Sequence, residues 1–295
     1  YYSGPDWYNP YYLTNQHYRY LEYYFGQISE LLTRYGQVDI LWFDSLGSSS
    51  LNQWDPRTMI RRIKQYQPDI LINNRMNGTR GGNKGPLAED LKGDFLTPEC
   101  KLGPFNDKTP WESCMTVADI PGTRWTGNWS YTSKAKVKPV EESIKFLINN
   151  TVKDGNLLYN IGPTPLGTFV PEQADTFLSM GKWIAPYREA IYGTRGGPYK
   201  DMPWGGSCYK TNRNGKKTVY LHVSPLIAQK GKELKGSEPL FIKDTGDKFT
   251  RATVIVDGTF NGKEARLEKE GGQYKITLPA GMSWDKWDTV SYTHL

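Results

Sequence analysis

A short apolar run that ends on one carboxylate is the stretch that most restricts how this chain can fold. Residues 38–44 read VDILWFD, after a helical pattern and before small polar residues. An apolar run bounded in this way predicts a strand buried on both faces, as in a parallel sheet. In an α/β barrel the carboxyl ends of the strands form the active site. Asp44 is therefore the first candidate for chemistry. With equal weight, it could cap the next element or pair with a buried arginine.

Helical and strand patterns alternate over the first two thirds of the chain. Apolar residues at steps of three and four predict four amphipathic helices, at 14–35, 55–68, 139–152 and 171–191. Short apolar runs between them predict buried strands at 38–44, 70–75, 93–99 and 156–163. This alternation indicates an α/β fold, a parallel sheet whose faces are covered by helices.

The pattern changes after Gly193, where a stretch rich in Gly and Pro leads into short alternating runs. Asn214-Gly215 and Asp257-Gly258 have the composition of hairpin turns. We therefore expect a small antiparallel β-sandwich, with strands at 218–223, 240–242, 252–256 and 274–278. Residues 291–295 do not continue an apolar strand, and the pattern favours a truncation or cloning scar there. The chain opens on what looks like the end of a strand, so we expect the natural N-terminus to lie upstream.

Composition removes several classes of function. The net charge of +6 comes from scattered Lys and Arg, which argues against nucleic-acid binding. No apolar run approaches the roughly 20 residues that span a bilayer. Three cysteines without a CxxC pair and three distant histidines predict neither a disulfide framework nor a metal site, and no cofactor is expected. The 10 Trp and 20 Tyr fit a sugar-binding protein, although an aromatic core would explain them too.

Two carboxylates, Asp44 and Glu99, end separate predicted strands, and Arg75 ends the strand between them. Trp42 and Trp129 could supply aromatic walls. Glycoside hydrolysis needs such a pair: one carboxylate attacks the anomeric carbon, and the other protonates the leaving oxygen and later activates water. Burial among aromatic residues can raise the pKa of the acid as that role requires. The spacing alone is a weak signal, because any α/β protein has acidic strand ends.

Several segments together resemble the α-L-fucosidases of glycoside hydrolase family 29. The similarity runs in order from residue 1 to about residue 200. It is carried by YYS with DW at 1–7, LTRYGQVDILWFD at 32–44, GDFLTPE at 93–99, WESC at 111–114, GNLLYNIGP at 155–163 and EAIYGT at 189–194.

The resemblance implies a fold and a reaction. Residues 1–197 would be the C-terminal part of a (β/α)8 TIM barrel, and residues 198–295 a β-sandwich domain. The reaction would be retaining hydrolysis of terminal α-L-fucose from a fucosylated oligosaccharide or glycoconjugate, through a covalent fucosyl-enzyme intermediate. Asp44 would be the nucleophile and Glu99 the general acid/base, with carboxyl oxygens about 5–5.5 Å apart. No metal would be needed.

The resemblance also implies a sugar pocket. Trp42, Tyr1 and Trp129 would line it, with Trp129 facing the methyl group of fucose, and Arg75 would lie near Asp44. Arg75 could instead form a purely structural ion pair with Asp44, which would still keep that carboxylate ionised. Glu112 competes with Glu99 for the role of the acid, because its surroundings are equally aromatic.

The chain departs from the family pattern in two ways. The first barrel strands, which bring a pair of histidines to the sugar, would lie before Tyr1, and Ser45 replaces the usual glycine. We therefore expect the fragment alone to be inactive or nearly so. A non-catalytic fucose- or glycan-binding protein and a retaining glycosidase of galactoside-like specificity remain as other interpretations. The family implies an extracytoplasmic location, in the bacterial periplasm or secreted, or lysosomal in a eukaryote.

Overall fold

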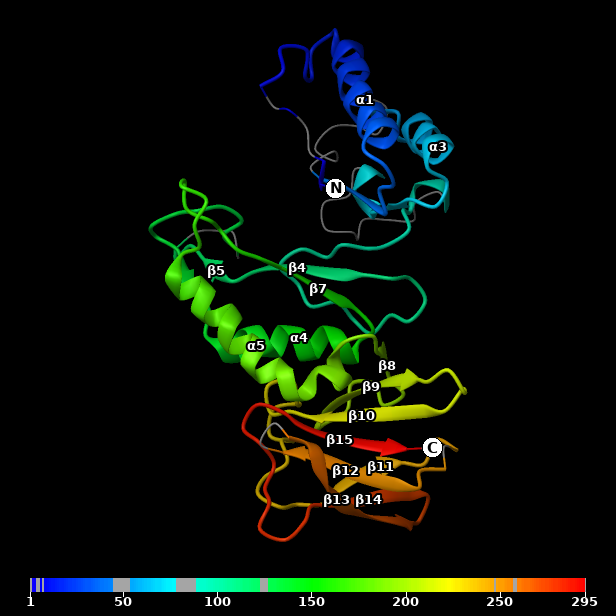
Figure 1. The fold of residues 1–295 in the computed structure, drawn as a ribbon, viewed down its shortest axis with the longest axis vertical. Helices are drawn as coiled ribbons and strands as arrows, with labels where there is room; N and C mark the ends of the chain where they lie inside the picture. The colour runs from blue at the N-terminus through cyan, green and yellow to red at the C-terminus, as the bar shows by residue number, and fades with distance from the viewer. Residues whose placement is uncertain are drawn as a thin grey trace. The chain divides into compact units, whose positions relative to one another are not determined.

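The computed structural model describes residues 2–3, 6, 8–44, 54–77, 89–122, 127–246, 248–256 and 259–294 (Figure 1). The chain divides into two compact units. The first comprises Tyr1–Glu99 and Thr109–Glu112, and the second comprises Cys100–Lys108 and Ser113–Leu295. The domain boundary at 197/198 that the family resemblance implies stays a prediction.

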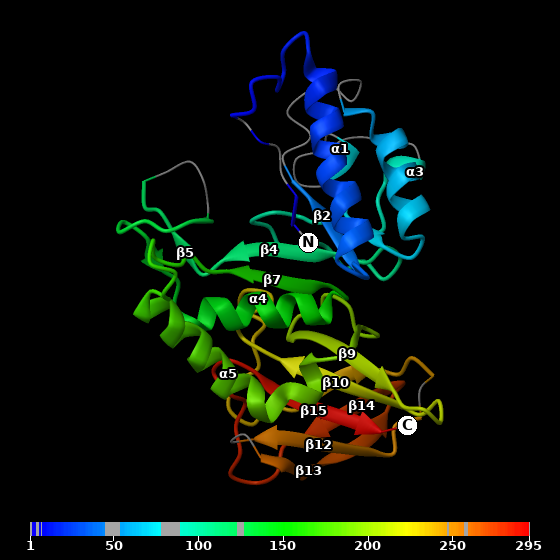
Figure 2. The ribbon, with the colours of Figure 1, turned by 45° about the horizontal axis from the view of Figure 1, so that its top comes forward.

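A three-stranded parallel sheet forms the centre of the first unit. Its order is β1 (Tyr2–Ser3), β2 (Ile40–Phe43) and β3 (Leu71–Ile72). The helices α1 (His17–Arg34) and α3 (Pro56–Tyr66) lie beside this sheet (Figure 2). Two predicted helices and two predicted buried strands are thus present, with shorter bounds. The unit is an α/β arrangement, as the alternating pattern indicates.

The helices cover one face of this sheet. Leu41 and Phe43 are fully buried and share a core with Ile28 of α1 and Ile63 of α3. Ile40 and Leu71 point to the opposite face, since successive side chains of a strand alternate, and they are 42% and 44% exposed. The expected burial on both faces is therefore wrong for these strands: the described helices of this unit pack on one side only.

Local signals explain where α3 begins. Asp55 accepts a hydrogen bond from the backbone N–H of Thr58, and Pro56 occupies the first helical position. The side chain of Asp55 thus satisfies an amide that has no partner within the helix, and Pro56 has no amide hydrogen to satisfy. The helix then directs Met59 and Ile63 into the core.

The predicted strand at 93–99 is wrong in extent, because its residues form isolated bridges instead of a continuous ladder. Phe95 pairs with Asn73, and Leu96 pairs with Trp111. The Asp94 carboxylate, rather than a backbone carbonyl, accepts the amide of Ile72 at 2.8 Å. Pro98 has no N–H to donate to a ladder. The segment is still held parallel to β3, and Glu99 follows it.

Two helices and two small sheets belong to the second unit. The helices α4 (Val140–Val152) and α5 (Pro171–Ile191) lie side by side, as Figures 1 and 2 both show. They pack on one another through Ile144, Ile148 and Met180. Both match the predicted ranges closely. The predicted strand at 156–163 is β7 (Asn156–Asn160), which pairs with β4 (Glu112–Thr116). β5 (Ala118–Asp119) pairs with β6 (Lys136–Val137). The sequence pattern did not predict β4, β5 or β6.

The C-terminal part of the second unit is an antiparallel sheet, in the order β11-β14-β13-β12-β15-β10-β9-β8. The strands are β8 (Arg195–Gly196), β9 (Gly205–Thr211), β10 (Lys217–Val223), β11 (Leu240–Lys243), β12 (Arg251–Val256), β13 (Thr259–Glu270), β14 (Gln273–Thr277) and β15 (Thr289–His294). β13 pairs with β12 up to Ala265 and with β14 from Arg266. Leu221 and Val254 then share a core with Leu240 and Ile276, so the sheet folds over on itself at β13.

The turn predicted at Asn214-Gly215 joins β9 to β10, and Gly215 has a positive φ of 77° there. Asp257-Gly258 lies outside the described residues. The expectation that no strand continues past residue 290 is wrong, because β15 pairs with both β10 and β12 up to His294. The expected truncation or cloning scar stays a prediction. A strand with partners on both sides is held by two backbone ladders, so it needs no long apolar run.

No helix in the described part of the chain is long and apolar enough to cross a membrane. The cysteines Cys100, Cys114 and Cys208 are all free thiols.

Candidate active site

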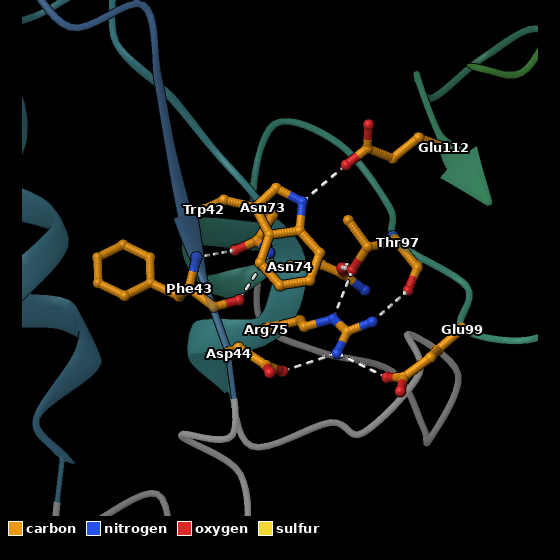
Figure 3. Close-up of polar contacts among 9 residues, drawn as sticks. All are labelled: Trp42, Phe43, Asp44, Asn73, Asn74, Arg75, Thr97, Glu99 and Glu112. Carbon is orange, nitrogen blue, oxygen red and sulfur yellow. Dashed lines mark hydrogen bonds and ion pairs between the residues drawn. The ribbon is translucent and has the colours of Figure 1, made fainter. Parts of the chain in front are cut away.

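A buried arginine lies between the two predicted carboxylates (Figure 3). The Nη1 atom of Arg75 donates to Oδ1 of Asp44 at 2.7 Å and to Oε2 of Glu99 at 2.8 Å. Because one nitrogen holds both, these two oxygens can lie at most the sum of the two distances, 5.5 Å, apart. That limit falls in the range of about 5–5.5 Å that retaining glycosidases use.

Arg75 is held by the segment that carries Glu99. Its Nε donates to Oγ1 of Thr97 at 2.9 Å, and its Nη2 donates to the Thr97 carbonyl at 3.1 Å. Thr97 in turn donates from its backbone N–H and its hydroxyl to Oδ1 of Asn74. Thr97 and Asn74 are almost completely buried. The orientation of the guanidinium is thus fixed by groups that water does not reach.

An indole ring covers the guanidinium. Cζ of Arg75 lies 4.5 Å from the centroid of the Trp42 ring, within the range of a cation–π contact. Trp42 and Asp44 are two residues apart at the end of β2, so both side chains point away from the helices. The β2 strand thus supplies the carboxylate and the aromatic wall together.

Asn73 fixes the backbone directly before Asp44. The last backbone pair of β2 and β3 is Leu41 with Ile72. Beyond it, the buried Asn73 side chain accepts from the Phe43 N–H at 3.0 Å and donates to the Phe43 carbonyl at 2.8 Å. A side chain therefore completes the edge of the sheet at the position where the chain turns toward the site.

Asp44 and Glu99 differ in access to water. The Asp44 side chain is 23% exposed, whereas that of Glu99 is 38% exposed. An acid/base must exchange protons with water and the leaving group. The greater exposure of Glu99 fits that access, whereas burial, the effect that raises the pKa of an acid, acts on Glu112.

The competing carboxylate, Glu112, makes a different contact. Its Oε1 accepts a hydrogen bond from the indole N–H of Trp42 at 2.7 Å. Burial raises the pKa of Glu112, an effect opposed by this hydrogen bond and by the charge of Arg75. Glu112 thus lies at the edge of the Arg75 cluster, attached to its aromatic wall.

Four predicted residues therefore come together: Asp44, Glu99, Arg75 and Trp42. Tyr1 lies outside the described residues. Trp129 belongs to the second unit, where it is 40% exposed and its carbonyl accepts from Asn160 Nδ2. In the parts of the chain that the structure describes, no three His, Cys, Asp or Glu side chains are grouped to hold a metal ion.

Sequence reasoning missed the supporting polar residues Asn73, Asn74 and Thr97. A signal for the first two was present, because two consecutive amides directly after an apolar run are unusual in a purely structural strand end. Thr97 gave no such signal, since threonine is common in strands.

A close pair of carboxylates at the carboxyl ends of neighbouring parallel segments is the arrangement that retaining glycoside hydrolases use. A family model described as alpha-L-fucosidase matches residues 1–189, and the chain belongs to that family.

Known members share modest identity with the chain. The plasma alpha-L-fucosidase of Rattus norvegicus is 27% identical over 232 residues, covering 75% of this chain and 47% of the relative. The chain spans about half the length of the curated relatives it matches.

Solved structures extend the likeness to the fold of nearly the whole chain. Alpha-L-fucosidase isoenzyme 1 from Paenibacillus thiaminolyticus is 26% identical with a TM-score of 0.72, covering 94% of this chain and 62% of that one. A trapped covalent intermediate of a family 29 alpha-L-fucosidase from Bacteroides thetaiotaomicron, with 2-fluoro-fucosyl fluoride, is 24% identical with a TM-score of 0.77. It covers 99% of this chain and 66% of that chain.

Proposed function

We propose that the protein is a retaining α-L-fucosidase that removes terminal α-L-fucose from fucosylated glycans. The observation that carries the proposal is the single Arg75 nitrogen bound to both Asp44 and Glu99, which keeps one oxygen of each carboxylate within 5.5 Å of the other, closer than inverting glycosidases need. Membership of the α-L-fucosidase family supports the choice of sugar. The covalent intermediate trapped in the Bacteroides relative supports the covalent route.

In the first step, a carboxylate oxygen of Asp44 attacks the anomeric carbon of the fucoside. The bond between that carbon and the leaving oxygen breaks, and Glu99 gives its proton to the leaving oxygen. The aglycone departs as an alcohol, and the sugar is held as an ester of Asp44. Arg75 orients Asp44 for the attack, because its Nη1 donates to Oδ1 of that carboxylate.

In the second step, Glu99 acts as a base. It takes a proton from a water molecule, whose oxygen attacks the anomeric carbon and displaces the Asp44 carboxylate. Two inversions give net retention of configuration. Arg75 assists again, since the departing carboxylate regains its charge beside the guanidinium. Because Arg75 contacts both carboxylates, it can stabilise the negative charge on whichever of them carries it during the reaction.

The fold and substrate contacts belong to the same proposal. Residues 1–197 would supply the C-terminal part of a (β/α)8 barrel, and residues 198–295 a β-sandwich domain. Trp42, Tyr1 and Trp129 would line the fucose pocket, Trp129 beside the methyl group. The partner would be a fucosylated oligosaccharide or glycoconjugate. The plasma and tissue enzymes among the relatives support an extracytoplasmic or lysosomal location.

The test is hydrolysis of an aryl α-L-fucoside by the full-length gene product beside two variants. Asp44→Gly should lose at least about a thousandfold in kcat. Azide should restore part of the turnover, giving a fucosyl azide of inverted configuration. Glu99→Ala should retain more activity on an aryl fucoside, whose leaving group needs little protonation, than on a fucosylated sugar. The matched control is Asp69→Gly, at an exposed aspartate in the turn before β3.

The outcomes separate the interpretations. Near-normal turnover by Asp44→Gly would contradict the nucleophile assignment. A wild-type protein that binds fucose without hydrolysing any aryl fucoside would favour the non-catalytic glycan-binding protein. Faster hydrolysis of an aryl galactoside than of the fucoside would favour the galactoside-like enzyme.

A further inference from the structure

Glu112 links the two segments that carry the proposed catalytic carboxylates. Its backbone N–H donates to the carbonyl of Leu96 at 3.0 Å, three residues before Glu99. Its side chain accepts the indole N–H of Trp42 at 2.7 Å, two residues before Asp44. One residue is thus hydrogen-bonded to the acid/base segment through its main chain and to the nucleophile strand through its carboxyl group.

The side-chain contact acts on Arg75 through the ring of Trp42. An indole can rotate about two side-chain bonds, and a hydrogen bond to its only N–H restricts that rotation. The ring so held lies 4.5 Å over the Arg75 guanidinium. The cation–π attraction depends on the ring face being presented to the cation. The orientation of Trp42 therefore bears on the nitrogen that holds both Asp44 and Glu99.

We propose that Glu112 is a positioning residue of the fucosidase reaction, acting through Trp42 and Arg75 on both carboxylates. The inference rests on the proposed function. Glu112 acts through Trp42, whose indole N–H its carboxyl group accepts. Its carboxylate serves as a fixed hydrogen-bond acceptor, and its partial burial makes that acceptor strong, because hydrogen bonds strengthen where water is excluded.

This role differs from that of a second acid. An acid must deliver a proton to the leaving oxygen, so its loss hurts poor leaving groups most. A positioning residue acts on the geometry of both steps, so its loss lowers kcat by a similar factor for all leaving groups. The chemistry of Glu112 also predicts rescue: glutamine keeps a carbonyl oxygen that can accept the indole N–H, whereas alanine keeps none.

The test is a double-mutant cycle on aryl α-L-fucosides of graded leaving-group pKa, using the full-length gene product. Glu112→Ala should lower kcat/KM by about 10- to 100-fold, the range expected when a partly buried donor loses its acceptor. Glu112→Gln should remain within about 5-fold of wild type. In a Trp42→Phe background, which has no indole N–H, Glu112→Ala should cost less than about 3-fold, because the two residues act as one unit. Glu30→Ala, at an exposed glutamate of α1, is the matched control.

A spectroscopic measurement makes failure of this inference distinguishable from failure of the fucosidase proposal. The indole N–H resonance of Trp42, assigned by its loss in Trp42→Phe, should shift and exchange faster with solvent in Glu112→Ala, whether or not the protein hydrolyses fucosides. Additive losses in the cycle, an unchanged resonance, or a Glu112→Gln loss that grows with leaving-group pKa would each overturn the positioning role. An inactive wild type with the resonance shift intact would overturn the fucosidase proposal instead.

Discussion

The side-chain amide of Asn73 is hydrogen-bonded to both backbone polar groups of Phe43, the residue directly before Asp44. Asn73→Ala should therefore leave a buried N–H and a buried carbonyl without partners. Each such group costs about 1–3 kcal/mol, so we expect the free energy of unfolding to fall by about 2–6 kcal/mol. We also expect a lower kcat, because the backbone that carries Asp44 is no longer fixed. Urea unfolding and fucoside hydrolysis measure the two effects.

Asn15→Ala is the matched control, because Asn15 is exposed in the turn before α1. Its free energy of unfolding should stay within about 0.5 kcal/mol of wild type. An equal effect of the two substitutions would show that the two hydrogen bonds of the Asn73 side chain to Phe43 do not stabilise the end of β2.

Position 93 requires glycine, because the backbone there lies against the backbone of Asn73 at the end of β3. Its φ is +72°, and a Cβ atom placed there would lie 2.7 Å from the backbone carbon and oxygen of Asn73. Gly93→Ala should displace the segment that carries Thr97 and Glu99. We expect a loss above the roughly 1–3 kcal/mol that the left-handed conformation alone costs a residue with a side chain.

Gly36 provides the control for conformation without crowding. Its φ is +88°, yet no atom lies within 4 Å of a Cβ added there. Gly36→Ala should thus show only the conformational cost and no loss of kcat. If Gly93→Ala and Gly36→Ala destabilise the protein equally in urea titrations, the close contact with Asn73 is not limiting.

The nearly buried Arg75 side chain balances the negative charge of two carboxylates, Asp44 and Glu99. Arg75→Met should leave Asp44 and Glu99 facing one another without a cation. Breaking a buried ion pair by removing one partner typically costs about 3–5 kcal/mol, and we expect kcat/KM to fall by about a hundredfold or more.

Arg75→Lys separates charge from geometry. Lysine keeps the cation, but its single ammonium group cannot replace the planar fork that also donates twice to Thr97. We expect an intermediate activity and little recovery of stability. A lysine variant as active as wild type would show that charge alone suffices at this position.

The sequence predicts the site residues that end apolar runs, but it does not predict those that act through hydrogen bonds to residues far away in the chain. Asp44, Arg75 and Glu99 end consecutive apolar runs, and the carboxyl ends of parallel strands meet, so their grouping was predictable. Thr97 and Asn73 act through hydrogen bonds to residues 22 and 30 positions away. Which residues become partners depends on the register between neighbouring strands, and the alternation of apolar residues within one strand does not specify that register.

The same reason explains the errors in the fold. Residues 93–99 look like a strand, yet they do not form a continuous ladder. The Asp94 carboxylate accepts the Ile72 amide in place of a backbone carbonyl, and Pro98 has no N–H to donate. β15 gave no strand signal near its end, yet it is paired on both sides. In both cases the neighbouring backbone, rather than the local composition, decides whether a strand forms.

A buried pair in the second unit predicts how stability depends on pH. His222 and Asp288 are fully buried, and their side chains contact at 2.7 Å between Nδ1 and Oδ2. Burial alone would lower the pKa of His222, but the charge of Asp288 and the contact with the Cys208 sulfur outweigh it and raise that pKa well above 6.5. The folded protein therefore binds one proton that the unfolded chain releases near pH 6.5.

The sign of the dependence follows from this difference. The stabilisation is complete below about pH 6.5, the pKa of the unfolded histidine, and is lost as the pH rises through the raised pKa of the folded state. Between the two values the free energy of unfolding should fall by about 1.4 kcal/mol per pH unit. Urea titrations followed by circular dichroism from pH 6 upward measure the slope, and His222→Gln should remove it. A slope that persists unchanged in His222→Gln would assign the pH dependence to other groups.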